Sequence, residues 1–253
     1  MVAARPVTRA PADGPDVART TRAAQSPGSR RATRDEAFRV LRSNLLVAID
    51  ELANPIVVVT SAQAGEGKTS TSVMLARSLA LAGPRVVLVD LDLRRPDAHR
   101  LLGADNVPGC SEVLQDRREI EECLQFLPPP KSSPAASGLY FLPAGGASAN
   151  PTELLGTPRT GRLLDALAKE ADIVLLDTPP VLPVADTLVI GRLAAGAVLV
   201  VEARRTPVQM VNRAKAALIR NQTRILGVVL NQLRASDDDA GYEYGYGDLN
   251  SAH

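Results

Sequence analysis

The chain alternates short, continuous apolar runs with longer segments in which apolar residues recur every three or four positions. Continuous runs of Val, Ile and Leu are typical of strands buried on both faces of a parallel sheet. The predicted strands are Ile56–Thr60, Val86–Asp90, Leu139–Leu142, Ile173–Asp177, Ala197–Val201 and Leu226–Leu230. The predicted helices between them are Ser70–Leu81, Glu119–Phe126, Arg159–Lys169, Val184–Arg192 and Pro207–Arg220. This alternation predicts an α/β fold with a doubly wound, mainly parallel sheet flanked by helices.

The region before the first strand divides into two parts. Residues 1–34 contain seven arginines, two aspartates and almost no large apolar side chain, so we expect a disordered basic arm. The arm is either a solvated tail or a segment attracted to anionic lipid headgroups. Apolar side chains recur at helical spacing over residues 35–52, which predicts an amphipathic helix before the core. One domain over residues 35–234, followed by a flexible tail over 235–253, completes the predicted organisation.

The segment between the first strand and the first helix reads as a phosphate-binding P-loop. Gly65 and Gly67 let successive backbone N–H groups turn toward phosphate oxygens, and the helix that follows adds its positive end. Lys68 is placed to reach the β- and γ-phosphates, and the Thr69 hydroxyl to bind Mg²⁺. Ala62 replaces the first glycine of the usual motif. A mere glycine-softened turn is the alternative, but strand and helix stand where the motif needs them.

Three aspartates follow predicted strands. Asp90 and Asp92 end the second strand, and Asp177 ends a later one. A single aspartate after a strand often caps the next helix, but in a parallel α/β sheet the carboxyl ends of strands share one edge. Mg²⁺ prefers carboxylate, phosphate and water oxygens. We therefore expect these side chains to converge on the P-loop and to bind a nucleoside triphosphate with Mg²⁺.

Composition narrows the class of protein. The longest apolar stretch, Leu193–Val201, is far shorter than the roughly 18–20 residues that cross a bilayer, and the basic arm lacks the apolar core of a secretory signal. Cys110 and Cys123 have neither metal-ligand nor disulfide-framework spacing, which fits a reducing cytosol. Tryptophan is absent and the two histidines are far apart, so we expect neither a nucleic-acid stacking platform nor a zinc site; His99 is interpreted as a surface or packing residue.

The C-terminal tail has an unusual composition. Three of the chain's four tyrosines, Tyr242, Tyr244 and Tyr246, alternate with glycine and glutamate after three consecutive aspartates. A packed strand would also show alternating aromatic residues, but this segment lacks aliphatic partners. A flexible, acidic segment that presents phenol groups is typical of a kinase substrate, which is the interpretation we favour.

With these features in hand, the chain resembles the bacterial tyrosine kinases (BY-kinases), P-loop autokinases associated with capsule and exopolysaccharide export. The likeness extends from about Asp35 to Gly247, and its motifs are specific as an ordered set rather than singly. They are the helix motif Glu36-x-x-Arg39-x-x-Arg42, a Walker A motif at Thr60–Ser70, a Walker A′ motif at Val86–Pro96, the segment Asn150–Leu155, a Walker B motif at Ile173–Pro180, the run Gly227–Asn231, and the tyrosine cluster. Ala64 departs from the proline that the family often has in this loop.

The resemblance assigns roles to individual residues. The nucleotide-binding residues would be Ala64, Gly65, Glu66, Gly67, Lys68, Thr69, Ser70 and Asn231, the last against the adenine unless it only ends a strand. The metal-binding residues would be Thr69, Asp92 and Asp177, and the catalytic residues Lys68, Asp90, Asp92 and Asp177. Either Asp90 or Asp92 would accept the tyrosine proton. The phosphoacceptors would be Tyr242, Tyr244 and Tyr246, and Glu36, Arg39 and Arg42 would join neighbouring subunits into a ring.

The resemblance also implies partners and a location. ATP and Mg²⁺ would be required, and tyrosines would be phosphorylated in trans within the homo-oligomeric ring. Many family members carry a membrane-spanning chain-length domain, which this sequence lacks, so a separate membrane-embedded protein would supply the activating segment. The protein would then be cytoplasmic and peripheral at the inner face of the membrane, a cognate tyrosine phosphatase would reverse the reaction, and nucleic acid would not be a partner.

Two other functions are compatible with part of the pattern. ATPases of the partitioning and division-site kind share this fold, but they carry a signature lysine five residues before the P-loop lysine, where this chain has Gln63. A nucleotide-gated scaffold of a polysaccharide export complex is the non-catalytic alternative, with its tail phosphorylated by another kinase. The scaffold differs from an autokinase in whether Lys68 is needed for tyrosine phosphate to form in the purified protein, whereas an ATPase of the partitioning kind has no use for a tyrosine tail.

Overall fold

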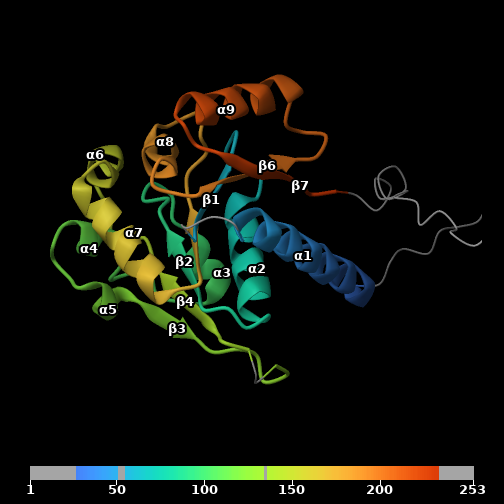
Figure 1. Cartoon of the computed structure of the whole chain (residues 1–253), viewed down its shortest axis with the longest axis horizontal. Helices are drawn as coiled ribbons and strands as arrows, with labels where there is room; N and C mark the ends of the chain where they lie inside the picture. The colour runs from blue at the N-terminus through green and yellow to red at the C-terminus, as the bar shows by residue number, and fades with distance from the viewer. Residues whose placement is uncertain (1–26, 51–54, 134–135, 234–253) are drawn as a thin grey trace, which may run out of the picture.

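The computed structural model describes residues 27–50, 55–133 and 136–233, which form one twisted sheet between two layers of helices (Figure 1). The sheet has seven strands in the order β3-β4-β2-β5-β1-β6-β7. Their bounds are β1 Ile56–Ser61, β2 Val86–Asp90, β3 Gln125–Leu127, β4 Leu139–Leu142, β5 Ile173–Asp177, β6 Gly196–Glu202 and β7 Ile225–Asn231. Every pairing is parallel except that of β3 with β4. The predicted doubly wound α/β fold is confirmed.

Each face of the sheet buries a separate apolar cluster. Along β1, Ile56 and Val58 point to one face while Val57 points to the other, as the alternation of strand side chains requires. The helices over the face of Val57 are α1 Pro27–Ile49, α2 Lys68–Ala80 and α3 Ala98–Leu102. The helices over the opposite face are α4 Cys110–Leu114, α5 Ile120–Cys123, α6 Pro151–Leu155, α7 Pro158–Glu170, α8 Asp186–Gly191 and α9 Val208–Arg220. Because the central strands are covered on both faces, their continuous apolar runs are explained.

The prediction fails in the segment before β4. We expected a helix over Glu119–Phe126, but α5 is a short helix that ends at Cys123, and Gln125–Leu127 forms the edge strand β3. Phe126 lies opposite Tyr140 in the antiparallel register, with ring centroids 5.1 Å apart. This cross-strand pairing outweighs the local helical pattern, because an edge strand gains its stability from the neighbour to which it is paired.

Helix α1 is also longer than expected. It begins at Pro27, so residues 27–34, which we expected to belong to a disordered arm, have helical backbone. Residues 1–26 and the C-terminal tail with its three tyrosines lie outside the described residues, as do residues 51–54. The short helices α3, α4 and α6 were not predicted at all, since each is only five residues long and too short to show a helical period.

The strand order brings the three predicted nucleotide motifs together. Strands β2, β5 and β1 are direct neighbours at the centre of the sheet, and all three run in the same direction. Asp177 at the end of β5 is in register with Asp90 of β2 on one side and with Val59 of β1 on the other. The P-loop and the two acidic strand ends therefore meet at the carboxyl ends of the central strands.

Candidate functional site

The P-loop connects β1 to α2 and takes its shape from two glycines. Gly65 and Gly67 have φ angles of 89° and 87°, in the left-handed region that residues with a Cβ rarely adopt. Gly67 has a second reason to be glycine, since a Cβ there would lie 2.1 Å from Nδ2 of Asn231. Helix α2 starts directly afterwards at Lys68, so its positive N-terminal end faces the loop. This is the geometry of a phosphate-binding site.

Lys68 is the centre of a cluster of charged and polar side chains. Its Nζ lies 2.8 Å from Oδ2 of Asp92 and 3.8 Å from Oδ2 of Asp177, and it donates a hydrogen bond of 3.1 Å to Oγ1 of Thr69. Burial alone would lower the pKa of Lys68, but the negative charges of Asp177 and Asp92 together outweigh burial and raise it. Lys68 is therefore held as a cation beside two carboxylates.

Asp177 is fully buried at the end of β5. Its Oδ1 accepts a hydrogen bond of 3.0 Å from Oγ of Ser72, whereas its Oδ2 accepts none from any described residue. Burial raises the pKa of Asp177, although the nearby Lys68 ammonium acts in the opposite direction. A buried carboxylate oxygen without a donor needs an explanation. A cation at this edge of the sheet would supply one.

Asp90 and Asp92 have different surroundings although they are two residues apart. The fully buried Asp90 accepts hydrogen bonds from the backbone N–H groups of Asp92 (3.1 Å) and Ala98 (3.2 Å), and burial and then Asp177 raise its pKa well above the ordinary value. Asp92 instead directs Oδ2 at Lys68, while its Oδ1 accepts a hydrogen bond of 3.0 Å from the N–H of Arg95. Asp90 thus shapes the loop, and Asp92 points into the site.

These residues fit the expected Mg²⁺ and nucleotide. The Thr69 hydroxyl, Asp92 and the Oδ2 of Asp177, which accepts no hydrogen bond from a described residue, are hard oxygen donors next to the phosphate-binding loop, which is the donor set that Mg²⁺ prefers. Lys68 and the N-terminal end of α2 supply the positive charge that triphosphate oxygens require. The structure therefore brings Lys68, Thr69, Asp92 and Asp177 together as the sequence predicted, with Asp90 behind them.

Glu66 is one of the predicted nucleotide-binding residues, and its side chain is buried and hydrogen-bonded to other residues of the chain. Its side chain is only 3% exposed, and Oε2 accepts a hydrogen bond of 3.0 Å from the N–H of Gln63 while Oε1 accepts one from the hydroxyl of Thr206. The Nδ2 of Asn231 donates a 3.0 Å hydrogen bond to the backbone oxygen of Glu66. Thr206, which sequence reasoning missed, thus links the connection before α9 to the P-loop, and Asn231 links the end of β7 to it.

The predicted assembly residues lie on α1. Arg39 and Glu36 form an ion pair one helical turn apart, and both side chains are 60% exposed. Arg42 differs, because its Nη1 donates a 2.9 Å hydrogen bond to the backbone oxygen of Ser78 in α2. Glu36 and Arg39 are therefore available to a neighbouring subunit, whereas Arg42 already binds within its own chain.

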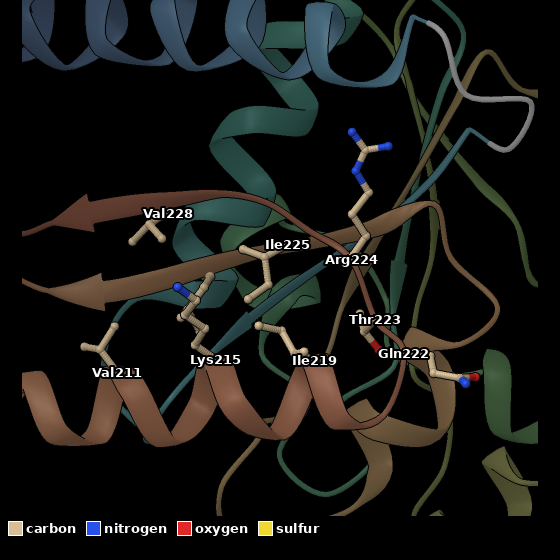
Figure 2. A pocket seen from close by; sticks show the side chains of 9 residues that line it. Val211, Lys215, Ile219, Gln222, Thr223, Arg224, Ile225 and Val228 are labelled. Atoms are coloured by element: carbon tan, nitrogen blue, oxygen red, sulfur yellow. The ribbon is translucent and has the colours of Figure 1, made fainter.

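A groove of about 590 Å³ lies away from this site, between α9 and the edge of the sheet (Figure 2). Val211 and Ile219 of α9 and Ile225 and Val228 of β7 line it with apolar side chains, beside Lys215. It contains no carboxylate and no phosphate-binding loop, so it is not the chemical centre of the molecule. Among the described residues, no helix is long and apolar enough to cross a membrane.

Comparisons with known proteins agree with this geometry. A family model described as ParA, an NUBPL iron-transfer P-loop NTPase, matches residues 53–245. Tyrosine-protein kinase YwqD of Bacillus subtilis is 33% identical over 83% of this chain and 85% of its own length. Tyrosine-protein kinase wzc of Salmonella typhimurium is 33% identical over 83% of this chain, but the match spans only 29% of wzc.

Among solved structures, the kinase domain of the Escherichia coli tyrosine kinase ETK superimposes with a TM-score of 0.72. Its sequence is 31% identical, and the superposition covers 84% of this chain and 80% of that domain. The likeness therefore extends over almost the whole described part of the chain, including the P-loop and the two acidic strand ends.

Proposed function

Because the chain belongs to the bacterial tyrosine kinases, within the ParA-like P-loop NTPases, we propose that it is an ATP-dependent protein-tyrosine autokinase. It transfers the γ-phosphoryl group of ATP to Tyr242, Tyr244 and Tyr246 of a neighbouring subunit. The observation that carries the proposal is the convergence of Lys68 on Asp92 and Asp177 at the end of a P-loop.

In this reaction the protein mainly positions groups and neutralises charge. The N–H groups of the P-loop and the ammonium of Lys68 bind the β- and γ-phosphates, where negative charge must be balanced. Thr69, Asp92 and Asp177 would hold Mg²⁺, which when bound neutralises phosphate charge and aligns the phosphates for in-line transfer. Lys68 is held in place by the carboxylates of Asp92 and Asp177.

The proton of the attacking phenol needs an acceptor. A tyrosine hydroxyl has a pKa of about 10, so a carboxylate must lie within hydrogen-bond reach to assist. Asp90 is fully buried and its carboxylate faces the backbone N–H groups of Asp92 and Ala98, whereas Asp92 directs Oδ2 into the site, at Lys68. We assign the role of base to Asp92: the phenol oxygen bonds to the γ-phosphorus, the bond to the β–γ bridging oxygen breaks, ADP leaves, and Asp92 takes the proton.

The exposed side of α1 and the tyrosine tail suggest how subunits would assemble. We propose that Glu36 and Arg39 join subunits into a ring, so that each tail enters the site of the next subunit. Each phosphate adds about −1.5 to −2 charges to a tail that is already acidic, and the accumulated charge would weaken contacts in the ring. Sedimentation velocity before and after incubation with ATP tests this step, and an unchanged assembly would refute it.

The biological role proposed is control of capsular or exopolysaccharide synthesis and export. A membrane-embedded partner would supply an activating cytoplasmic segment and keep the kinase at the inner face of the membrane, and a cognate phosphatase would remove the phosphates. These proposals rest on membership of the family. The chain spans only 27% of the length of the putative tyrosine-protein kinase EpsB of Ralstonia solanacearum and 29% of the length of wzc, so the activities of those whole proteins do not transfer to it directly.

The test is incubation of the purified protein with ATP and Mg²⁺, alone and with the cytoplasmic segment of a candidate membrane partner, beside a Lys68→Met variant. Intact mass and peptide mapping should find phosphate on the tail tyrosines of the wild type and none on the variant. If tyrosine phosphate forms on the wild type and on Lys68→Met only when another kinase is added, the protein is better described as a nucleotide-gated scaffold. ATP turnover without tyrosine phosphate would favour an ATPase switch of the partitioning kind.

A further inference from the structure

Arg94 forms a two-pronged ion pair outside the cluster around Lys68. Its Nε lies 2.7 Å from Oδ2 of Asp186 and its Nη2 lies 3.1 Å from Oδ1 of the same carboxylate. Asp186 is fully buried at the first position of α8, while the Arg94 side chain is 39% exposed. A planar guanidinium that meets a carboxylate with two donors fixes orientation as well as distance.

Thr152 of α6 completes the network. Its Oγ1 accepts a hydrogen bond of 2.8 Å from Nη2 of Arg94 and donates one to Oδ1 of Asp186. The three side chains thus bond to one another in a closed triangle. They come from the loop after β2, from α6 and from α8, which are distant in sequence. The Asn150–Leu155 segment supplies no residue to the cluster around Lys68, but its Thr152 holds Arg94 and Asp186 together.

The network joins the two acidic strand ends. Arg94 follows Asp92 by two residues, in the turn where the N–H of Arg95 donates to Oδ1 of Asp92. Asp186 is anchored on the other side, because the adjacent Thr187 donates a 2.6 Å hydrogen bond to the backbone oxygen of Pro179, in the segment that leaves β5 after Asp177. Holding Arg94 against Asp186 therefore restrains the Asp92 turn relative to that segment.

We propose that Asp186, through Arg94 and with the help of Thr152, is a positioning residue that orients Asp92 toward Lys68 and the metal. The inference rests on the proposed function, because it gives Asp92 a part in binding Mg²⁺ and in accepting the proton. None of the three side chains needs to touch nucleotide for this role. Their effect passes through the backbone of the turn that carries Asp92.

The test is a double-mutant cycle with Arg94→Gln, Asp186→Asn and the combination. If Asp186 acts only through Arg94, each single variant and the double variant lose tyrosine phosphorylation by the same factor, about tenfold or more. Losses that multiply would mean that the two residues act independently. Thr152→Val should lose less, and Thr152→Ser, which keeps the hydroxyl, should behave as the wild type.

Two further readouts do not depend on kinase activity. In nucleotide-free protein, amide hydrogen exchange over residues 91–97 should become faster in Arg94→Gln and Asp186→Asn. The affinity for a fluorescent ATP analogue should respond less to added Mg²⁺ in the variants than in the wild type. Unchanged exchange and an unchanged Mg²⁺ response would overturn the proposal. Because these readouts need no phosphorylation, they stay informative even if the proposed kinase activity fails.

Arg159→Gln is the matched control. Arg159 is 41% exposed and pairs with Asp116, so its replacement also removes a partly exposed arginine ion pair, but one at the start of α7, away from the P-loop. This variant should show the same general loss of stability without faster exchange in the Asp92 turn. If it reproduces the effect of Arg94→Gln on the Mg²⁺ response, the effect is one of stability and the positioning role is wrong.

Discussion

Gly65 and Gly67 have nearly identical φ angles but different surroundings, so replacing each by alanine distinguishes the cost of backbone strain from the cost of a steric clash. Each replacement by alanine imposes left-handed strain of about 1–2 kcal/mol. At Gly65 the new Cβ meets no atom within 4 Å, whereas at Gly67 it meets the amide of Asn231. We expect Gly67→Ala to lower the free energy of unfolding more than Gly65→Ala, as measured by urea denaturation.

The added loss at Gly67 should disappear when Asn231 is also replaced by alanine, because the clashing amide is then gone. The same second substitution should not rescue Gly65→Ala. Equal losses for the two glycine variants would show that Asn231 does not hold the P-loop in the way described.

Asp177→Asn tests whether the buried carboxylate is kept for function at the expense of stability. Because the pKa of Asp177 is raised in the fold, its ionised form is disfavoured there, and the cost is present at neutral pH. Asparagine keeps an oxygen for the Ser72 hydroxyl without the charge. The variant should therefore lose phosphorylation yet have a higher melting temperature than the wild type at pH 7.5.

The sign of the pH dependence follows from the same shift. A raised pKa means that the folded protein binds the proton more tightly, so the carboxyl costs nothing below its unfolded pKa and costs most once the pH exceeds its folded pKa. The difference in melting temperature between Asp177→Asn and the wild type should thus shrink as the pH falls toward 4. A difference that grows on acidification would contradict this account of the site.

At the residue scale, sequence reasoning found the groups that follow one another at fixed spacing. Lys68 and Thr69 are set by the loop motif, and Asp92 and Asp177 by the ends of strands. It missed Thr206 and Asp186, which reach the site from connections far along the chain. No local pattern marks such residues, because their partners are fixed only when the sheet has formed.

At the element scale, α1 carries two arginines that should respond differently to replacement. Arg39 pairs with the exposed Glu36, whereas Arg42 donates to the backbone of α2. Arg39→Ala should weaken the assembly with little change in melting temperature, since exposed ion pairs contribute about 0–1 kcal/mol. Arg42→Ala, in contrast, should lower the melting temperature, because it removes a hydrogen bond between α1 and α2.

Analytical ultracentrifugation and a thermal melt of each variant provide the measurements, with Arg77→Ala of α2 as the control for loss of a helical arginine. If Arg39→Ala assembles as the wild type does, α1 is not the ring contact. If Arg42→Ala leaves the melting temperature unchanged, its hydrogen bond to Ser78 contributes nothing measurable.

The central strands were predicted almost to the residue, because burial on both faces leaves a continuous apolar run that only such a strand shows. The periphery was predicted less well. Strand β3 exists because Gln125–Leu127 pairs with β4, and α6 because Pro151 begins a single turn that packs beside α7 and α8. These short elements depend on the neighbouring elements to which they pair or against which they pack, so their own residues carry little signal.

On the scale of the whole molecule, the candidate site and the proposed phosphoacceptors lie in different parts of the sequence. Lys68, Asp92 and Asp177 are built into the central sheet, while the three tail tyrosines follow the edge strand β7. The fourth tyrosine, Tyr140, is partly buried in β4 against Phe126. The proposed transfer between subunits would bring the tail sequence of one subunit to the site in the sheet of the next.

The most direct test of the account is a mixture of two variants, neither of which can phosphorylate its own tail. One is Lys68→Met, which keeps its tail tyrosines but lacks the phosphate-binding lysine. The other carries Tyr242→Phe, Tyr244→Phe and Tyr246→Phe on an intact site. After incubation with ATP, Mg²⁺ and the activating segment, intact mass spectrometry should find phosphate on Lys68→Met in the mixture and none when it is incubated alone. Phosphate on the wild type, but never on Lys68→Met in the mixture, would contradict transfer between subunits.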